Sequence, residues 1–236
     1  MAESSVTTST IQIAWPTCSI RAFEARPSGA GPHPAVIVIQ EWWGLNDHIK
    51  DVATRFAREG YVAVAPDLYS RLGNKVATNP DDAGKLMTSL DKPDGVADLQ
   101  AVVAHLNKAP GIKADRIGVT GFCMGGSYTT LLACSGADVK AAVAFYGEIP
   151  DEATLAKLNC PLLYIYGSED FWIQRNDVDR LAATLKTLSK PGEVKIYDGA
   201  PHAFFNDTRR DVYRPKEAAD AWQRTLALFA KQLKTA

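Results

Sequence analysis

The sequence of 236 residues is poor in cysteine and has almost no excess charge, and each shortage excludes a class of protein. Its four cysteines form no CxxC pair and no Cys/His cluster at metal spacing, which argues against a disulfide scaffold or a structural zinc site: they are Cys18, Cys123, Cys134 and Cys160. The 26 Lys and Arg balance 27 Asp and Glu, so the sequence has no basic stripe for nucleic acid and no polybasic membrane patch. No apolar run reaches the roughly 18 residues of a transmembrane helix. We therefore expect no nucleic-acid, membrane or metal partner, and a reducing, cytoplasmic compartment.

The first ten residues are polar and rich in Ser and Thr, without the basic and apolar layout of a secretion signal. We predict a flexible tail over 1–10 and a single domain over 11–236. Hydrophobic residues make up 46% and charged residues 22% of the chain, which is typical of a globular protein with a substantial core.

Most of the chain alternates short apolar runs with helical stripes. The run Ala35–Gln40 is apolar throughout, as in a strand buried on both faces, and helical spacing follows it. The alternation predicts an α/β fold, with a mostly parallel sheet and helices on both faces. We expect an antiparallel edge hairpin over 11–24, and a mobile covering loop with a possible short helix over 70–90. The predicted strands are 35–40, 61–65, 116–120, 139–146, 162–166 and 194–198, and the predicted helices are 47–59, 92–108, 124–134, 177–189 and 215–233.

A sharp turn between a predicted strand and a predicted helix presents a cysteine. The segment Gly121–Gly126 has the G-x-S-x-G pattern of a nucleophile elbow, with Cys123 in place of serine. The tight turn needs small residues two positions before and after the nucleophile, and the helix N-terminus favours a thiolate. We predict Cys123 as nucleophile and the Met124 amide as an oxyanion donor. The alternatives are a buried core cysteine and a phosphate-binding turn, although no G-x-G-x-x-G pattern is present.

A thiol nucleophile needs a base and an acid that orients the base. In folds with a nucleophile elbow, the acid comes after the nucleophile in the chain and the base comes after the acid. His202 directly follows the last predicted strand and is the predicted base. Asp170 follows the strand 162–166 and is the predicted acid, with Glu169 and Glu148 as alternatives. The other three histidines lie where surface or packing roles are typical: His33, His48 and His105.

The end of the first buried strand contributes further candidates. The Trp42 amide is the predicted second oxyanion donor. Glu41 would lie beside the thiol, where it can hold the thiol by a hydrogen bond or accept its proton; an ordinary salt-bridged glutamate is the alternative. Other aromatic residues follow the strand ends and predict an aromatic-lined acyl pocket, with core packing as the alternative: Trp43, Tyr146, Phe171, Trp172 and Phe204.

Five motifs together resemble the dienelactone hydrolase family: Gln40–Gly44, Pro66–Tyr69, Gly121–Gly126, Asp170–Phe171 and His202–Phe204. The resemblance implies an α/β-hydrolase fold without a large cap domain, a triad of Cys123, His202 and Asp170, and control of the thiol by Glu41. It also implies opening of enol lactones through an acyl-thioester intermediate, without a cofactor or metal.

The chain departs from the family at the two arginines that hold the substrate carboxylate. Asn206 stands four residues after His202, where the family has one of them, and no arginine occurs from Leu72 to Asp115. Candidate replacements, none at a matching position, are Arg71, Arg209, Arg210 and Lys85. Dienelactone itself is therefore in doubt as the substrate, whereas the reaction class is unaffected.

These observations predict a carboxylic ester hydrolase that resembles carboxymethylenebutenolidases, a monomer or small homo-oligomer that acts on a small-molecule ester or lactone. Two alternatives stay open. An acyltransferase would use the same triad with an alcohol or thiol acceptor, and a redox-sensing or binding protein would use a reactive Cys123 without turnover.

Overall fold

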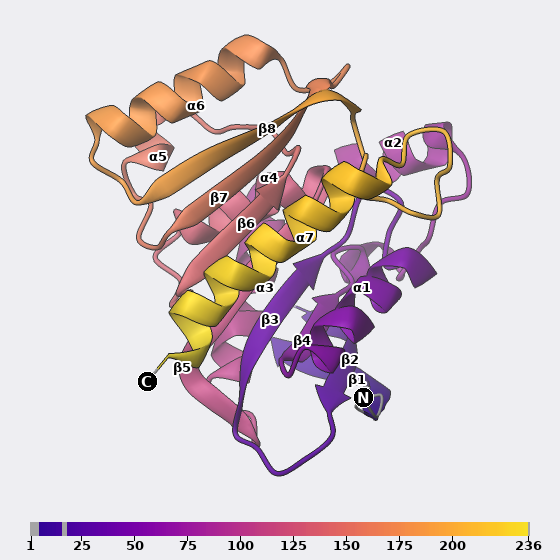
Figure 1. Cartoon of the computed structure of the whole chain (residues 1–236). Coiled ribbons are helices and arrows are strands. Elements are labelled where there is room, and N and C mark those ends of the chain that lie inside the picture. The colour runs from indigo at the N-terminus through magenta and orange to yellow at the C-terminus, as the bar shows by residue number, and fades with distance from the viewer. Residues whose placement is uncertain (1–4, 16–17, 236) are drawn as a thin grey trace.

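The computed structural model describes residues 5–15 and 18–235, and all the strands in this part of the chain belong to one eight-stranded sheet. Its order is β1-β2-β4-β3-β5-β6-β7-β8, with β1 and β2 antiparallel to their neighbours and the others parallel (Figure 1). The bounds are β1 (Val6–Trp15), β2 (Cys18–Pro27), β3 (His33–Ile39), β4 (Val62–Pro66), β5 (Ile112–Phe122), β6 (Ala141–Phe145), β7 (Leu162–Glu169) and β8 (Gly192–Pro201).

Helices cover both faces of the sheet, which confirms the predicted α/β-hydrolase layout. They are α1 (Asp47–Arg58), α2 (Pro80–Ser89), α3 (Lys92–Leu106), α4 (Met124–Ala133), α5 (Glu152–Leu155), α6 (Arg175–Thr187) and α7 (Pro215–Phe229), with a 3-10 turn at Ser70–Leu72 and a π-helical turn at Ala230–Lys234. Successive residues of β3 face opposite sides: Val36 and Val38 pack with α1 and α7, while Ile37 and Ile39 pack with α3 and α4. In Figure 1, α7 crosses the front of the sheet, and α3 and α4 lie behind it.

The start of the chain differs from the prediction of a flexible tail over 1–10. Residues 6–10 form the first half of β1, with Val6 opposite Pro27 and Thr10 opposite Phe23. The same Thr and Ser richness that suggested a tail includes β-branched residues that suit an exposed edge strand. Residues 1–4 lie outside the described part of the chain.

The polar segment 70–90 is more regular than predicted. Its second half is α2, a ten-residue helix. The side chain of Asn79 caps it by accepting a hydrogen bond from the Asp82 amide, and Pro80 occupies its first turn. Whether this segment moves over a substrate stays a prediction.

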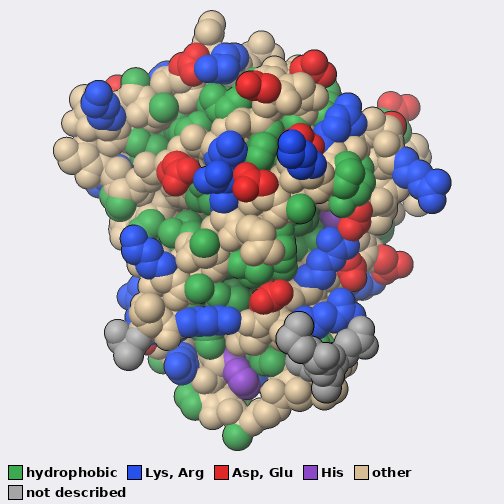
Figure 2. All heavy atoms as spheres, viewed as in Figure 1, with side chains coloured by type: hydrophobic (Ala, Val, Ile, Leu, Met, Phe, Trp, Pro, Cys, Tyr) green, Lys and Arg blue, Asp and Glu red, His purple; other side chains and the backbone are tan. Residues whose placement is uncertain are grey.

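One face of the molecule shows both signs of charge. On the face in Figure 2, basic and acidic side chains are interspersed among apolar ones, and neither sign of charge forms a single patch. None of the helices in the described ranges is long and apolar enough to cross a membrane.

The strand order decides which residues meet at the carboxyl edge of the sheet. Because β3 and β5 are neighbours, the segments that begin at Glu41 and Cys123 emerge side by side. Because β7 and β8 are neighbours, the segments carrying Asp170 and His202 also emerge side by side. This edge is where open α/β sheets bind ligands.

Candidate active site

Cys123 lies on a tight turn between β5 and α4, with the unusual backbone angle φ of 55° for a non-glycine residue. The glycines around it allow this turn. A Cβ atom on Gly121 would lie 2.2 Å from the Gly125 carbonyl oxygen, and one on Gly125 would lie 2.5 Å from the carbonyl oxygens of Ile39 and Gln40. The turn therefore rests directly on the backbone of the end of β3.

Two backbone amides point at the cysteine sulfur. The backbone amides of Met124 and Trp42 lie near Cys123 Sγ, where they act to lower the pKa of the thiol, and they come from different strand ends. Tyr69 joins their two segments, because its hydroxyl donates to the Trp42 carbonyl oxygen at 2.9 Å and lies 3.4 Å from Met124 Sδ. Amides that converge in this way form an oxyanion hole for an acyl group attached to the sulfur.

Tyr69 is a positioning residue, and its hydroxyl can be tested by substitution. Tyr69→Phe should lower kcat for an activated ester about tenfold with KM almost unchanged, because the Trp42 segment loses the bond that orients its amide. Tyr164→Phe is the matched control, since this buried tyrosine donates to the Gly147 carbonyl oxygen at 2.5 Å, away from the amides. Equal losses in both variants would indicate a general structural effect.

Asp170 and His202 form a close pair. Asp170 Oδ2 lies 2.7 Å from His202 Nδ1, and Asp170 Oδ1 accepts hydrogen bonds from the amides of Trp172 at 2.8 Å and Ile173 at 2.9 Å. The Asp170 side chain is fully buried. The alternative acids lie elsewhere: Glu169 is exposed, and Glu148 accepts a hydrogen bond from Lys92 Nζ at 2.8 Å. The geometry thus brings together the pair favoured by the sequence.

Glu41 is buried beside the cysteine, and Asn206 Nδ2 donates to its Oε2 at 2.9 Å. Burial raises the pKa of Glu41, while the charges of His202 and Arg209 and the bond from Asn206 act in the opposite direction. Burial also raises the pKa of the Cys123 thiol well above its ordinary range, and the Glu41 charge adds to this rise. The two amides near the sulfur act in the opposite direction.

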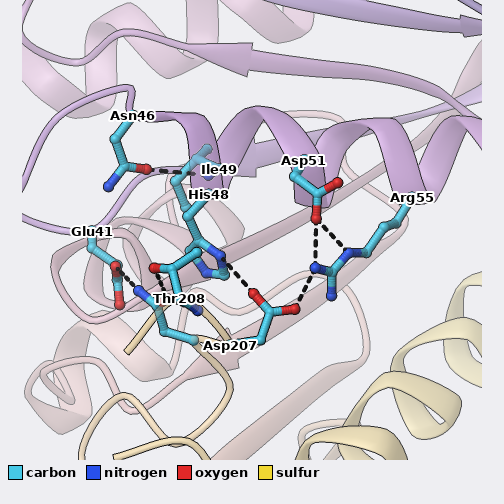
Figure 3. A network of polar contacts seen from close by, with 9 residues as sticks. Glu41, Asn46, His48, Ile49, Asp51, Arg55, Asp207 and Thr208 are labelled. Carbon is cyan, nitrogen blue, oxygen red and sulfur yellow. Dashed lines mark hydrogen bonds and ion pairs between the residues drawn. The ribbon is translucent and has the colours of Figure 1, made fainter. Parts of the chain in front are cut away.

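The segment that follows His202 is bound to α1 (Figure 3). Asp207 pairs with Arg55, whose Nε also donates to Asp51 at 2.7 Å, and Asp207 Oδ1 lies 3.5 Å from Nδ1 of His48. Asn206 directly precedes Asp207, and its Oδ1 accepts a bond from the Thr208 hydroxyl at 2.6 Å. The contact between Asn206 and Glu41 is therefore supported from α1.

His48 makes the fold sensitive to acid. Burial lowers its pKa to about 4, although the charge of Asp207 acts in the opposite direction. Because the unfolded chain takes up this proton near pH 6.5, the stabilisation is complete above that pH and is lost as the pH falls towards 4. Between pH 7 and pH 4 the free energy of unfolding should fall by up to about 3 kcal/mol less in His48→Gln than in the wild type. The measurement is a urea titration at each pH.

The control for this measurement is His105→Gln on α3, at a partly exposed position. It makes the same substitution on another helix. A His48→Gln variant with the same pH slope as wild type would contradict the assignment.

Three of the four catalytic candidates line one cavity of about 230 Å³, and Asp170 is absent from its described lining. Cys123, His202 and Glu41 line it, together with Trp42, Trp43, Met87, Phe171, Trp172, Ala203 and Arg209. Of the aromatic residues predicted for an acyl pocket, Trp43, Phe171 and Trp172 therefore lie where a substrate would contact them. The sequence analysis does not predict Met87, because it expects over 70–90 a covering loop with a possible short helix and no side chain directed at the site.

Two of the predicted aromatic contacts are wrong. Tyr146 and Phe204 are fully buried and are absent from the described lining of the cavity. They instead pack beneath the histidine, with the Tyr146 ring centroid 4.9 Å from that of His202 and 5.8 Å from that of Phe204. Both residues do follow strand ends, but their side chains enter the core between the sheet and α7.

The prediction that Arg71 binds the substrate is also wrong. It is not among the described residues that line the cavity, because its guanidinium binds both carboxylate oxygens of the buried Asp98 on α3, at 2.9 Å and 2.7 Å. Arg209, another candidate replacement, does line the cavity, and it forms an exposed pair with Asp211 at 2.6 Å. Over the ranges that the structure describes, no group of three or more His, Cys, Asp or Glu side chains is arranged to hold a metal ion.

A parallel sheet with a nucleophile elbow after β5 and an Asp–His pair after β7 and β8 defines an α/β-hydrolase. A family model described as the dienelactone hydrolase family matches residues 20–233. The chain belongs to that family.

Several relatives match over almost their whole length. A protein named "Protein usf" from Aquifex pyrophilus is 39% identical over 225 residues, which cover 91% of this chain and 94% of that protein. A "Putative carboxymethylenebutenolidase" from Aquifex aeolicus (strain VF5) is 35% identical over 226 residues, with the same coverage of 91% and 94%. A solved structure, described as a "Putative Dienelactone Hydrolase" from Klebsiella pneumoniae, superposes with a TM-score of 0.90 at 34% identity, covering 96% of this chain and 99% of that one.

Proposed function

We propose that the protein hydrolyses small-molecule carboxylic esters or enol lactones through an acyl-thioester on Cys123. The observation that carries the proposal is that His202, which is paired with the buried Asp170, lines the same cavity as Cys123, whose sulfur lies near two backbone amides. Membership in the dienelactone hydrolase family supports the reaction class.

In the acylation step, Cys123 Sγ bonds to the carbonyl carbon while its proton passes to Nε2 of His202, since Nδ1 faces Asp170. The carbonyl oxygen takes up the electron pair and accepts hydrogen bonds from the backbone amides of Trp42 and Met124. When the carbonyl re-forms, the bond to the alcohol oxygen breaks, and the alcohol leaves with the proton from His202. Asp170 stabilises the imidazolium of His202 from the time it takes the thiol proton until it gives the proton to the alcohol.

In the deacylation step, His202 takes a proton from water as the water oxygen attacks the thioester. The thiolate then leaves and regains the proton, and the acid is released. Because a thiolate is also a good leaving group, strained or activated acyl groups such as enol lactones suit this nucleophile better than plain esters or amides.

Glu41 has a role at the start of this cycle. Its charge raises the pKa of the thiol and so favours a protonated sulfur. The buried carboxylate can also accept the thiol proton, which makes it the second base of the site.

The test is direct detection of the acyl-enzyme. The protein is mixed with excess p-nitrophenyl acetate, quenched in acid, digested and examined by mass spectrometry. The acetyl group should be found on the peptide that contains Cys123 during turnover and vanish when the ester is exhausted. Peptides with Cys134 and Cys160, which are also buried, are the internal control.

Two other results would change the conclusion. Release of p-nitrophenol with the acetyl group found on an added alcohol rather than in acetate would indicate acyl transfer. Oxidation of Cys123 with no release of p-nitrophenol would replace the hydrolase by a redox sensor.

A further inference from the structure

A second hollow adjoins the catalytic cavity. It has a volume of about 300 Å³ and shares two walls with it, the side chains of Met87 and Trp172. We call it the α4 compartment, because one face of α4 forms its floor: Met124, Ser127, Tyr128 and Leu131. The two hollows therefore adjoin at the side chains of Met87 and Trp172.

Cys123 is absent from the described lining of the α4 compartment, but the residue after it, Met124, lines the compartment, which extends from there along α4. Met124 directly follows Cys123, and Leu131 lies seven residues further on, about 10 Å along the helix at 1.5 Å per residue. Leu90 lines the compartment as well, so it is mainly apolar near the catalytic cavity. At its rim, Lys92 pairs with Glu148 at 2.8 Å, with side-chain exposures of 63% and 48%.

The lining also indicates which part of an ester would enter. Cys123, His202, Phe171 and Ala203 line the catalytic cavity and are absent from the described lining of the α4 compartment, whereas Met124, next to Cys123 in the chain, lines it. The leaving alcohol must receive a proton from His202, so it has to stay in the catalytic cavity. The acyl group is bonded to Cys123, whose chain neighbour Met124 lines the α4 compartment.

We infer that the α4 compartment is an acyl subsite, and that the substrate carries an extended apolar acyl arm that lies along α4 beyond Met87 and Trp172. This inference rests on the proposed hydrolase function. An apolar arm of this kind gains from leaving water, whereas an acetyl group is too short to enter.

The experiment fixes the leaving group and varies the acyl chain, using p-nitrophenyl acetate, butanoate and octanoate. In the wild-type protein kcat/KM should rise from acetate to octanoate. Leu131→Trp, which fills the compartment, should lower kcat/KM for octanoate about tenfold or more and leave acetate within about twofold of wild type. Thr88→Trp fills it from the exposed side of α2 and should act in the same direction even if Leu131→Trp folds poorly.

The matched control is Leu228→Trp. Leu228 is a partly buried leucine on α7 that lines a different hollow, so its substitution should not change the chain-length profile. Hydrolysis that depends on Cys123 but shows no difference between acetate and octanoate in the filled variants would overturn the acyl subsite alone. Absence of hydrolysis for every ester in the wild type would overturn the proposed function and the subsite with it.

Discussion

Cys123→Ala is expected to lower kcat/KM for an activated phenyl ester by about 10⁴-fold to 10⁶-fold, the loss typical of removing the nucleophile of a triad. No other side chain in the described lining of the cavity has a thiol or hydroxyl group, since its remaining members are carboxylate, aromatic, aliphatic and basic residues. The residual rate would come from the two amides and from substrate binding.

Alanine is the right replacement, because it keeps the Cβ atom at the strained φ of 55° and so leaves the strain of the turn unchanged. Cys134→Ala is the control, at another buried cysteine at the end of the same helix. It should retain full activity. Activity in Cys123→Ala within about tenfold of wild type would exclude a cysteine-dependent reaction.

Asp170→Asn is expected to lower kcat by about 10⁴-fold with little change in thermal stability. The introduced amide oxygen can still accept the bonds from the amides of Trp172 and Ile173, so the loop should keep its shape. Its NH₂ group would then face His202 Nδ1 and donate to it. The imidazole would be held in the tautomer with its proton on Nε2, which cannot take the proton of the thiol.

Glu169→Gln is the control for this prediction, since it changes the neighbouring acid, whose side chain is exposed. Its kcat should stay within about twofold of wild type. The reverse ranking, with Glu169→Gln inactive and Asp170→Asn active, would assign the orienting role to the other carboxylate. The measurement is kcat and KM for p-nitrophenyl acetate, together with a melting curve for each variant.

Residues whose positions are set by the turns that follow strands were predictable from the sequence. The apolar runs at β3 and β7 indicated buried parallel strands, and Cys123, Asp170 and His202 are placed by the turns that follow strands. The family resemblance was confirmed by the match over 20–233. In these cases a short stretch of chain determines where the residue lies, so its local pattern was enough.

Features that depend on contacts between distant segments were not predictable. Arg71 looked available in the sequence, but Asp98 on α3 takes up its guanidinium. Tyr146 follows a strand end like the cavity residues, yet its ring turns into the core. The polar start of β5, Ile112–Arg116, gave no strand signal because most of its side chains are exposed, and β5 was predicted only from 116.

Backbone contacts around the cysteine turn separate the parts of the site that can vary from those that cannot. Gly121, Gly125 and Gly147 meet neighbouring main chain so closely that any Cβ there would collide with backbone atoms. The walls of the cavity, Met87, Trp43 and Trp172, are only side chains carried on loops and on α2. A library of variants at these wall residues would therefore change the substrate specificity while the backbone that holds the cysteine turn stays the same. This makes the protein a suitable starting point for directed evolution.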